Sequence, residues 1–255
     1  PTQISWLGYC NTMGIKNMDY LISDPNLIYP DEKELYSEKI LYLPSIWNCH
    51  SGLRSERIEI ETPAIKNKFI TFGSFNNYKK INDEVIEVWL NILKKIPNSR
   101  LLLKSSTKKE NDEFKKFIQK EHLEDRVIFL PTAKNFEDHI NLYKNIDIAL
   151  DTFPWNGVTT SFEAIWMGIP FITMKGYNFN SRCGESINKN IQMSELIAEN
   201  KEDYVSKVLS LTSDIKKLSN IRKQIFNKAL SSPLFDTQKF SNDFFNLIKN
   251  TQIKY

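Results

Sequence analysis

From residue 69 onward, short apolar runs alternate with amphipathic stretches, and this alternation constrains the fold more than any other feature of the chain. The apolar runs are FITF (69–72), LLLK (101–104), VIFL (127–130), IALD (148–151) and FITM (171–174). Each run is too short for a helix, so we predict five strands. Strands this apolar, when helices separate them, are typical of a parallel sheet covered on both faces. The pattern therefore predicts an α/β fold with a doubly wound, Rossmann-like lobe.

The segments between these runs carry helix signals. Behind the capping candidates Asn82 and Asp83, apolar side chains recur at helical spacing, and Pro97 ends that helix. Gly168 is a suitable stop for a helix over 160–167. Further helices are predicted near 110–121, 136–145, 181–190, 201–211 and 213–230, with a last one from about 236.

The first 68 residues differ in sequence pattern from the rest of the chain. Residues 1–48 contain the apolar runs ISWLGY, MDYLIS and ILYLP, which are too few for a complete sheet. The polar stretch 50–68, which contains Pro63, is predicted to be a linker. We expect these residues to belong to a second lobe. Because the chain begins with Pro1, we also expect it to be a fragment of a longer protein.

The amino-acid composition limits the kinds of function that the chain can have. With 255 residues, of which 41% are hydrophobic, the chain is long enough to bury a sizeable core. Its net charge is +3, and 34 basic and 31 acidic residues are mixed along the chain, which argues against nucleic-acid binding. No apolar run approaches the roughly 18 residues that span a membrane.

The cysteines point to a reducing compartment. Cys10, Cys49 and Cys183 are an odd number at wide spacing, so neither a disulfide framework nor a structural zinc site is indicated. We expect no metal site and a cytoplasmic location.

Two loops follow predicted strands and carry residues that suit an anionic ligand, because ligands of parallel α/β sheets bind at the carboxyl ends of the strands. In GSFNNYKKI, Asn77 permits a tight turn and Lys80 stands just before a helix, where it could reach a phosphate. A solvated surface lysine is the alternative. His139, on the helix before the strand 148–151, is either a ligand contact or a structural histidine.

The second loop lies within LDTFPWNGVTTSFEAIWMGIP (150–170). Asn156 and Gly157 give the backbone conformational freedom, while Thr159 and Thr160 provide hydroxyls and N–H groups at a helix start. This is the outline of a phosphate cradle, and Glu163 could accept from a ribose hydroxyl. The alternatives are that a threonine is only the N-cap and that Glu163 only complements the helix dipole.

Taken together, these segments resemble the catalytic region of the protein O-GlcNAc transferase and SPINDLY family of glycosyltransferases. The matching phrases are ISWLGY, MDYLISDP, YSEKILYLP, FGSFNNYKKI, WLNILKKIPNSRLLL, DTFPWNGVTTSFEAIWMGIPFITMKG, SELIA and SSPLFD. The resemblance implies a two-lobed GT-B fold that binds a nucleotide sugar without a metal or other cofactor. It also implies acceptor proteins as partners and tetratricopeptide repeats upstream in the full-length protein.

The resemblance divides the chain into the end of the N-terminal lobe with a linker (1–62), a C-terminal nucleotide-sugar-binding lobe (63–232) and a final helix that returns to the first lobe (233–255). It also implies roles for the candidate residues. The resemblance implies that Asn77 and Lys80 contact the diphosphate of the nucleotide sugar. It implies that the cradle of this diphosphate consists of Asn156, Gly157, Thr159 and Thr160. It further implies that Glu163 binds the ribose and that His139 lies near the base. Those near the sugar and acceptor are Leu7, Gly8 and Tyr9. Lys80 is the expected catalytic residue, because it can stabilise the charge that grows on the leaving diphosphate.

The resemblance favours inverting, metal-independent transfer of N-acetylglucosamine from UDP-GlcNAc to Ser or Thr hydroxyls. Cys10, Asn11, Leu142 and Val158 depart from the family pattern. Glu163, which stands where other members have Asp, leaves GDP-fucose as an alternative donor. The departures at Cys10, Asn11 and Val158 leave a nucleotide-sugar-binding module without turnover as the second alternative. An epimerase on the same two-lobed fold is disfavoured by the long-range matches. Because first-lobe groups are missing, we expect the printed chain alone to bind nucleotide without catalysing transfer.

Overall fold

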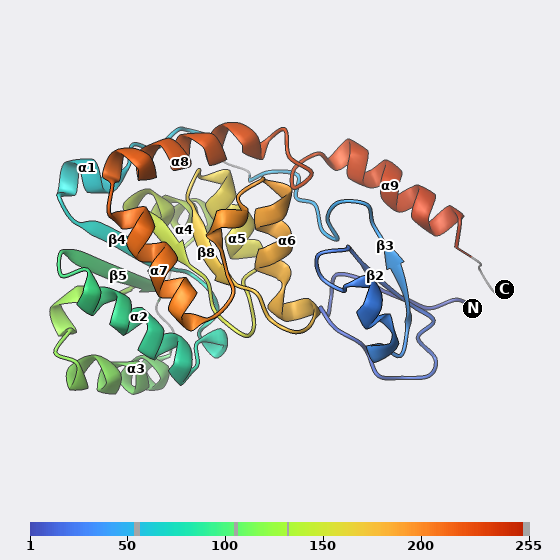
Figure 1. Cartoon of the computed structure of the whole chain (residues 1–255), viewed down its shortest axis with the longest axis horizontal. Helices are drawn as coiled ribbons and strands as arrows, with labels where there is room; N and C mark the ends of the chain where they lie inside the picture. The colour runs from blue at the N-terminus through green and yellow to red at the C-terminus, as the bar shows by residue number, and fades with distance from the viewer. Residues whose placement is uncertain (54–56, 105–106, 132, 252–255) are drawn as a thin grey trace.

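The larger part of the molecule is built on a parallel six-stranded sheet. The computed structural model describes residues 1–53, 57–104, 107–131 and 133–251 (Figure 1). The strands of this sheet are β4 (Ile70–Ser74), β5 (Ser99–Lys104), β6 (Val127–Leu130), β7 (Ile148–Leu150), β8 (Phe171–Met174) and β9 (Ile197–Ala198). Their spatial order is β6-β5-β4-β7-β8-β9, and all are parallel. The predicted doubly wound α/β fold is confirmed, because the chain reverses direction across the sheet between β4 and β7.

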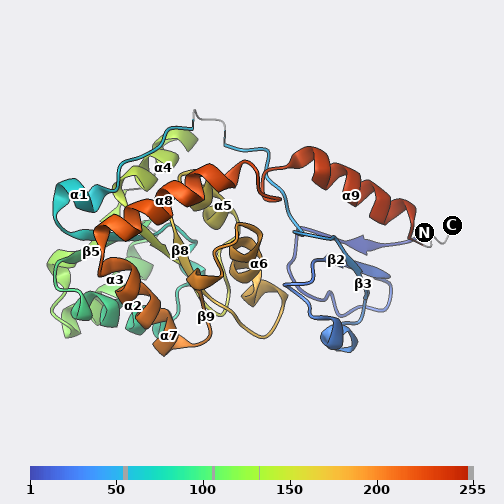
Figure 2. The ribbon, with the colours of Figure 1, turned by 45° about the horizontal axis from the view of Figure 1, so that its top comes forward.

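Helices cover both faces of this sheet (Figures 1 and 2). On one side lie α2 (Asp83–Lys95), α3 (Lys108–Lys120) and α7 (Lys201–Thr212), and on the other lie α4 (Phe136–Leu142) and α5 (Thr159–Trp166). α8 (Ile215–Ala229) packs against both α5 and α7. As predicted, the Asn82 side chain caps α2 by accepting from the Val85 N–H at 2.9 Å. Gly168 ends α5 with a φ of +69°, a left-handed conformation that glycine adopts without strain.

Two elements differ from the sequence prediction. The predicted linker contains a short helix, α1 (Pro63–Asn67), because Pro63 starts a helix readily at its first turn. The strand β9 was not predicted, since two residues are too few to form a recognisable apolar run.

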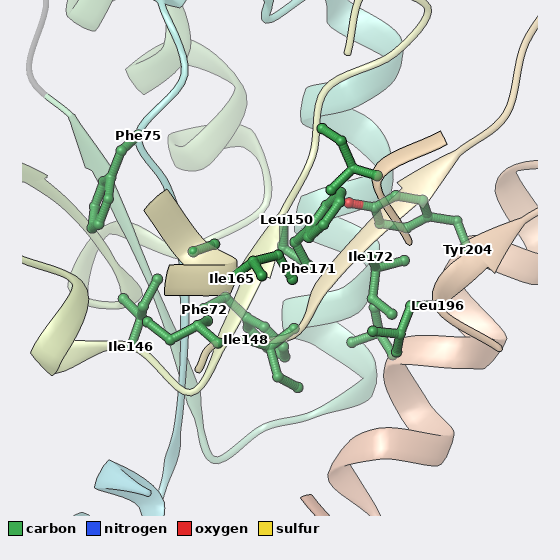
Figure 3. Packing of buried hydrophobic residues seen from close by; sticks show 14 of the residues in the cluster. Phe72, Phe75, Ile146, Ile148, Leu150, Ile165, Phe171, Ile172, Leu196 and Tyr204 are labelled. Carbon is green, nitrogen blue, oxygen red and sulfur yellow. The ribbon is translucent and has the colours of Figure 1, made fainter. Parts of the chain in front are cut away.

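The core lies between the central strands and the helices on either side of them. Figure 3 shows Phe72 of β4, Ile148 of β7 and Phe171 of β8 packed together, with Ile165 of α5 over them. These four side chains are at most 1% exposed. Burying a side chain of this size stabilises the fold by about 1.5–3 kcal/mol, so this cluster stabilises the pairing of β4 with β7, in which Phe72 lies opposite Ile148.

A second, smaller parallel sheet contains β1 (Ile4–Ser5), β2 (Tyr20–Ser23) and β3 (Lys39–Tyr42), in the order β1-β2-β3. The final helix, α9 (Thr237–Lys249), leaves the large sheet and lies along this small one (Figure 1). The ring of Trp6, which follows β1, lies 6.1 Å from the ring of Phe240 and 4.6 Å from that of Phe244. The last helix thus ties the two ends of the chain together through aromatic contacts.

The helix α6 (Cys183–Asn190) joins the two sheets. Arg182, just before it, forms an ion pair with Glu32, and its Nη2 donates to Glu32 Oε1 at 2.8 Å. Within α6, Ser186 Oγ donates to the buried Asp24 Oδ2 at 2.7 Å. Tyr29 Oη donates to Glu185 Oε1 at 3.0 Å. These buried and half-buried polar contacts fix α6 against the small sheet.

Gly184 is the position at which α6 approaches the large sheet most closely. A Cβ there would lie 2.1 Å from Thr173 Oγ1 and 2.9 Å from Asp151 Oδ2. We expect Gly184→Ala to lower the free energy of unfolding by about 1–3 kcal/mol, because overpacking forces neighbouring groups to move. Urea denaturation measures the change.

Gly8→Ala is the matched control, because a Cβ at Gly8 would meet no atom within 4 Å. Its expected effect stays within about 0.5 kcal/mol, as for other substitutions on a free surface. Equal stabilities of the Gly184→Ala variant and the wild type would contradict the close approach.

Candidate functional site

The buried carboxylate of Asp151 organises the loop that follows β7. Its Oδ1 accepts from the N–H of Gly157 at 2.7 Å and from the N–H of Thr152 at 2.9 Å. Oδ1 also accepts from Asn76 Nδ2 at 3.3 Å, and Oδ2 accepts from Thr173 Oγ1 at 2.7 Å. Burial raises the pKa of Asp151 to about 6, while these hydrogen bonds and the charge of Lys80 act in the opposite direction. One side chain thereby connects the ends of β4, β7 and β8.

Gly157 lets the loop turn tightly into α5. A Cβ at Gly157 would lie 2.7 Å from both Asn76 Oδ1 and Thr160 Oγ1. The Thr160 hydroxyl donates to Asn76 Oδ1 at 2.6 Å, and α5 has Val158 at its N-cap without a side-chain cap bond. The alternative that Thr159 or Thr160 only caps the helix is therefore wrong. In the first turn of α5 the Ser161 N–H donates to the Val158 carbonyl at 3.0 Å, while the N–H groups of Thr159 and Thr160 precede the regular helix hydrogen bonds.

A cavity of about 330 Å³ opens beside this turn, at the carboxyl ends of β4 and β5 and next to α5, the helix that follows β7. It brings together five of the residues that the sequence analysis singled out, namely Asn77, His139, Thr159, Thr160 and Glu163. It is further lined by Phe75, Asn76, Tyr78 and Lys104. Ligands of doubly wound sheets bind at this reversal point, so the cavity is the candidate site.

Glu163 lies on α5 with its carboxylate in a fixed position. Its Oε2 lies 3.0 Å from His139 Nε2 and accepts from Tyr143 Oη at 2.7 Å. Burial and the charge of Glu163 raise the pKa of Tyr143 well above its usual value, so this phenol stays protonated and donates. The Tyr143 ring also packs edge-on against Phe75, with centroids 4.8 Å apart. The alternative that Glu163 only complements the helix dipole from the first turn is wrong, because α5 begins at Thr159 and its first turn contains no acidic residue.

Lys80 does not line the cavity but stands at the edge of the same loop. Its Nζ donates to the backbone oxygen of Asn156 at 2.7 Å and lies 5.2 Å from the centre of the Trp155 ring. Asn156 is fully buried, and its Oδ1 accepts from the N–H of Gly184 at 3.2 Å. Lys80 and Asn156 are thus connected to each other and to α6.

Leu7, Gly8 and Tyr9 lie in the loop after β1, in the small-sheet part of the molecule. The side chains of Leu7 and Tyr9 are exposed, and the Gly8 N–H donates to the Trp6 carbonyl at 2.8 Å. Leu7 has a φ of +66°, which is uncommon for a branched side chain. The structure places none of the three in the cavity.

Sequence reasoning did not assign three residues that hold this site together. Asp151 was visible as an acid at a strand end, and Asn76 as a turn residue. Tyr143 could have been found from its spacing, since it follows His139 by four positions and therefore shares its helical face.

A second cavity, of about 440 Å³, lies between the end of the linker and α8. Its lining includes Glu59, Glu61 and Arg222. This cavity does not lie at the carboxyl ends of the strands, where ligands of doubly wound sheets bind, so it is not the candidate site.

Two features are absent from residues 1–53, 57–104, 107–131 and 133–251. Within them, no three or more His, Cys, Asp or Glu side chains are grouped so that they could hold a metal ion. No helix there is long and apolar enough to cross a membrane.

The sequence profile of Glycosyl transferase family 41 matches residues 1–51 and 57–244. The chain belongs to this family. A probable UDP-N-acetylglucosamine–peptide N-acetylglucosaminyltransferase SPINDLY from Solanum lycopersicum is 35% identical over 100% of the chain. The corresponding SEC protein of Arabidopsis thaliana is 29% identical, also over 100% of the chain. The suspected relation to O-GlcNAc transferase and SPINDLY is confirmed.

A solved structure of a family relative supports the same assignment. A mutant of the Thermobaculum terrenum O-GlcNAc transferase superposes with a TM-score of 0.87 at 28% identity, over 98% of this chain and 48% of that one. The fold is therefore that of the GT-B glycosyltransferases. The chain spans 28% of the tomato protein and 26% of the SEC protein, so family 41 members of this kind are much longer than the printed sequence.

We expect Asp151→Ala to lower the free energy of unfolding by at least about 3 kcal/mol, because it leaves several buried donors without an acceptor at about 1–3 kcal/mol each. Asp151→Asn keeps an oxygen for the N–H groups of Thr152 and Gly157. It should therefore cost only about 1 kcal/mol. Urea denaturation of both variants separates the two effects. Equal losses would show that the negative charge, and not the accepting oxygen, stabilises the loop.

Proposed function

We propose that this chain is the carboxyl-terminal part of a glycosyltransferase that moves N-acetylglucosamine from UDP-GlcNAc to Ser or Thr hydroxyls of proteins. Membership of family 41 supports the reaction class, and the names of its relatives support the donor and the acceptors. The single observation that carries the proposal is the cavity at the reversal point of the sheet, where Asn77, His139, Thr160 and Glu163 converge.

In this proposal the start of α5 and Lys80 hold the donor diphosphate. Helix N-termini and lysines both favour anions, and Thr159 and Thr160 add hydroxyls at that helix start. The Lys80 ammonium already stands beside the loop 152–157, so it needs little reorganisation to reach a phosphate oxygen. As the sugar leaves, negative charge grows on the diphosphate, and these groups stabilise the transition state more than the ground state.

Glu163 and His139 recognise the nucleoside. Tyr143 and His139 both contact Oε2 of Glu163, and among the residues that the structure describes none donates a hydrogen bond to Oε1. We assign Oε1 to a ribose hydroxyl. His139 also packs edge-on near Phe75, with centroids 6.3 Å apart, and we propose that this histidine lies near the base.

The acceptor approaches from the small sheet. We propose that residues 1–62 end the first lobe, that 63–232 form the nucleotide-sugar lobe and that 233–255 return to the first lobe. Leu7, Gly8 and Tyr9 then face the sugar and the acceptor hydroxyl, which attacks the anomeric carbon with inversion. Repeats that capture acceptor proteins are proposed for the full-length protein.

Donor identity is tested by calorimetry on the natural full-length protein with UDP, GDP, UDP-GlcNAc and GDP-fucose. We expect UDP and UDP-GlcNAc to bind and the guanine nucleotides to bind much more weakly. Tight binding of GDP-fucose with indifference to UDP would overturn the donor assignment while keeping the reaction class. Binding without transfer to any protein would favour the nucleotide-sugar-binding module.

Lys80→Ala should remove most transfer activity without affecting the fold. A preorganised contact to a developing charge contributes about 2.7–4 kcal/mol, so we expect a loss of about 100–1,000-fold in the single-turnover rate. Lys79→Ala is the matched control, because Lys79 is the exposed neighbour on the same short turn. An unchanged rate in the Lys80 variant would remove this residue from the mechanism.

A further inference from the structure

Half of a buried arginine side chain on α8 is unpaired. Arg222 is 3% exposed. Its Nη1 donates to the carbonyl oxygen of Ile146 at 3.0 Å and to that of Asp147 at 2.9 Å, immediately before β7. Nε and Nη2 of the same guanidinium have no hydrogen-bond partner among the described residues. Buried donors are paired in the great majority of native structures, so these two nitrogens indicate an acceptor that the described part of the chain does not supply.

The unpaired nitrogens form one edge of the guanidinium. Nε and Nη2 direct one N–H each to the same side of the planar group, while Nη1 uses both of its N–H bonds on the two carbonyl oxygens. Arginine binds both oxygens of a carboxylate through such an edge, with two parallel hydrogen bonds. The free edge of Arg222 therefore has the geometry of a carboxylate receptor.

The neighbouring acid Asp147 does not fill this role. Its Oδ1 accepts from the N–H of Ala64 and its Oδ2 from the N–H of Thr71, at 2.8 Å each. Burial lowers the pKa of Arg222 to about 10, and the charge of Asp147 acts in the opposite direction. The guanidinium is therefore charged at neutral pH, and an anion at its free edge would compensate this buried charge.

Arg222 lines the cavity of about 440 Å³ between the end of the linker and α8. This volume falls within the range of about 300–1,000 Å³ that is typical of small-molecule sites. The cavity walls include the apolar side chains of Ile60, Ile65, Met167 and Phe226. A buried cation beside apolar walls suits a small ligand that carries both a carboxylate and a hydrocarbon group.

Arg57 fixes the linker beside this cavity. Its Nε donates to the carbonyl oxygen of Trp166 at 2.8 Å, and its Nη2 donates to that of Phe226. The Arg57 guanidinium also lies 3.8 Å from the centre of the Phe226 ring. These contacts hold the linker against α5 and α8, so the cavity is preformed, which lowers the entropic cost of binding.

The cavity is remote from the candidate site. Ile146 and Asp147 precede β7, and Met167 precedes β8, so the cavity lies at the amino ends of these strands. α1, whose Ile65 lines the cavity, lies at the opposite end of the large sheet from the small sheet (Figures 1 and 2). A ligand bound here would contact neither the proposed donor site nor the small sheet.

We propose that this cavity is a binding site for a small apolar α-amino acid, with its carboxylate on the free edge of Arg222 and its ammonium beside Glu61. Two acidic and two basic side chains line the cavity, so a zwitterion leaves the local charge balanced. Glu59 forms an ion pair with Lys223 at 3.8 Å, whereas Glu61 has no ion-pair partner among the described residues. Glu61 is therefore the acid available to an ammonium group. This site goes beyond the proposed function and does not depend on it.

Calorimetry on the natural full-length protein tests the site. The probes are L-leucine, L-methionine and L-phenylalanine, whose side chains match the apolar walls. We expect at least one of them to bind in a saturable manner when no nucleotide sugar is present. If none of the three binds at millimolar concentration, the proposal is overturned.

Two analogues of the best-binding probe identify the groups that the site recognises. The amide lacks the carboxylate and should bind about 100-fold more weakly, because two hydrogen bonds to a charged group are lost. The deaminated acid should bind about two- to fivefold more weakly, as expected when an ion pair with an exposed glutamate is lost. An amide that binds as tightly as the amino acid would overturn the role of Arg222. Equal binding of the deaminated acid would overturn the assignment to amino acids.

A variant that fills the cavity locates the binding site. Ser219→Trp places a large ring in the cavity and keeps the bonds of Arg222 to the residues before β7, so it should abolish binding. Asn220→Trp is the matched control, because Asn220 is the exposed neighbour on the same helix and does not line the cavity. The control should bind as the wild type does. Wild-type affinity in Ser219→Trp would place the ligand elsewhere and contradict the proposal.

Arg222→Lys tests the two-pronged edge. The variant keeps a positive charge but cannot donate two parallel hydrogen bonds, so we expect the best probe to bind at least about tenfold more weakly. Because this substitution also removes a bond to the residues before β7, urea denaturation checks that the variant is folded. A folded Arg222→Lys variant with wild-type affinity would show that the fork is not used. If the variant does not fold, the comparison of Ser219→Trp with Asn220→Trp decides.

The binding test and the transfer test have separate outcomes. A protein that binds an amino acid in this cavity but transfers no sugar would support this site and overturn the proposed function. A protein that transfers sugar but binds none of the three probes would support the proposed function and overturn this site.

Discussion

The candidate site depends on one buried carboxylate. Asp151 stands at the end of β7, and its two oxygens accept from the loop behind it and from the neighbouring strands β4 and β8. Burying a carboxylate is energetically unfavourable unless hydrogen-bond donors surround it. Here the donors belong to the loop after β7 and to the ends of the neighbouring strands, which together form the site. The hydrogen bonds that Asp151 accepts therefore fix the turn at Gly157 and orient the start of α5 toward the cavity.

The second constraint is the attachment of α6 to both sheets. Its Gly184 packs against Thr173 and donates to Asn156, while Ser186 bonds to Asp24 of the small-sheet part. The donor loop, α6 and the small sheet are thus linked by hydrogen bonds with little free volume between them. Any change in how the small sheet sits against α6 is therefore transmitted to Lys80 through the same contacts.

Sequence reasoning succeeded where the signal is local. The five apolar runs form strands, Asn82 starts its helix and Gly168 ends its helix, all as predicted. These predictions succeed because capping and periodicity involve residues within a few positions of one another. Sequence reasoning was incomplete where the signal is very short or where one residue has two possible roles. β9 has only two residues, and the hydroxyl of Thr160, which looked like a cap, bonds instead to Asn76 from another strand end.

The sequence by itself determined the alternation of strands and helices, the family and the polar residues available at the strand ends, since these follow from order and chemical type. Only the tertiary structure decided which of those residues meet. Glu163 contacts Tyr143 and His139, and Asp151 contacts Asn76. The physical reason is that hydrogen bonding and burial act over a few ångströms, and the order of parallel strands, not distance along the chain, sets which groups come that close.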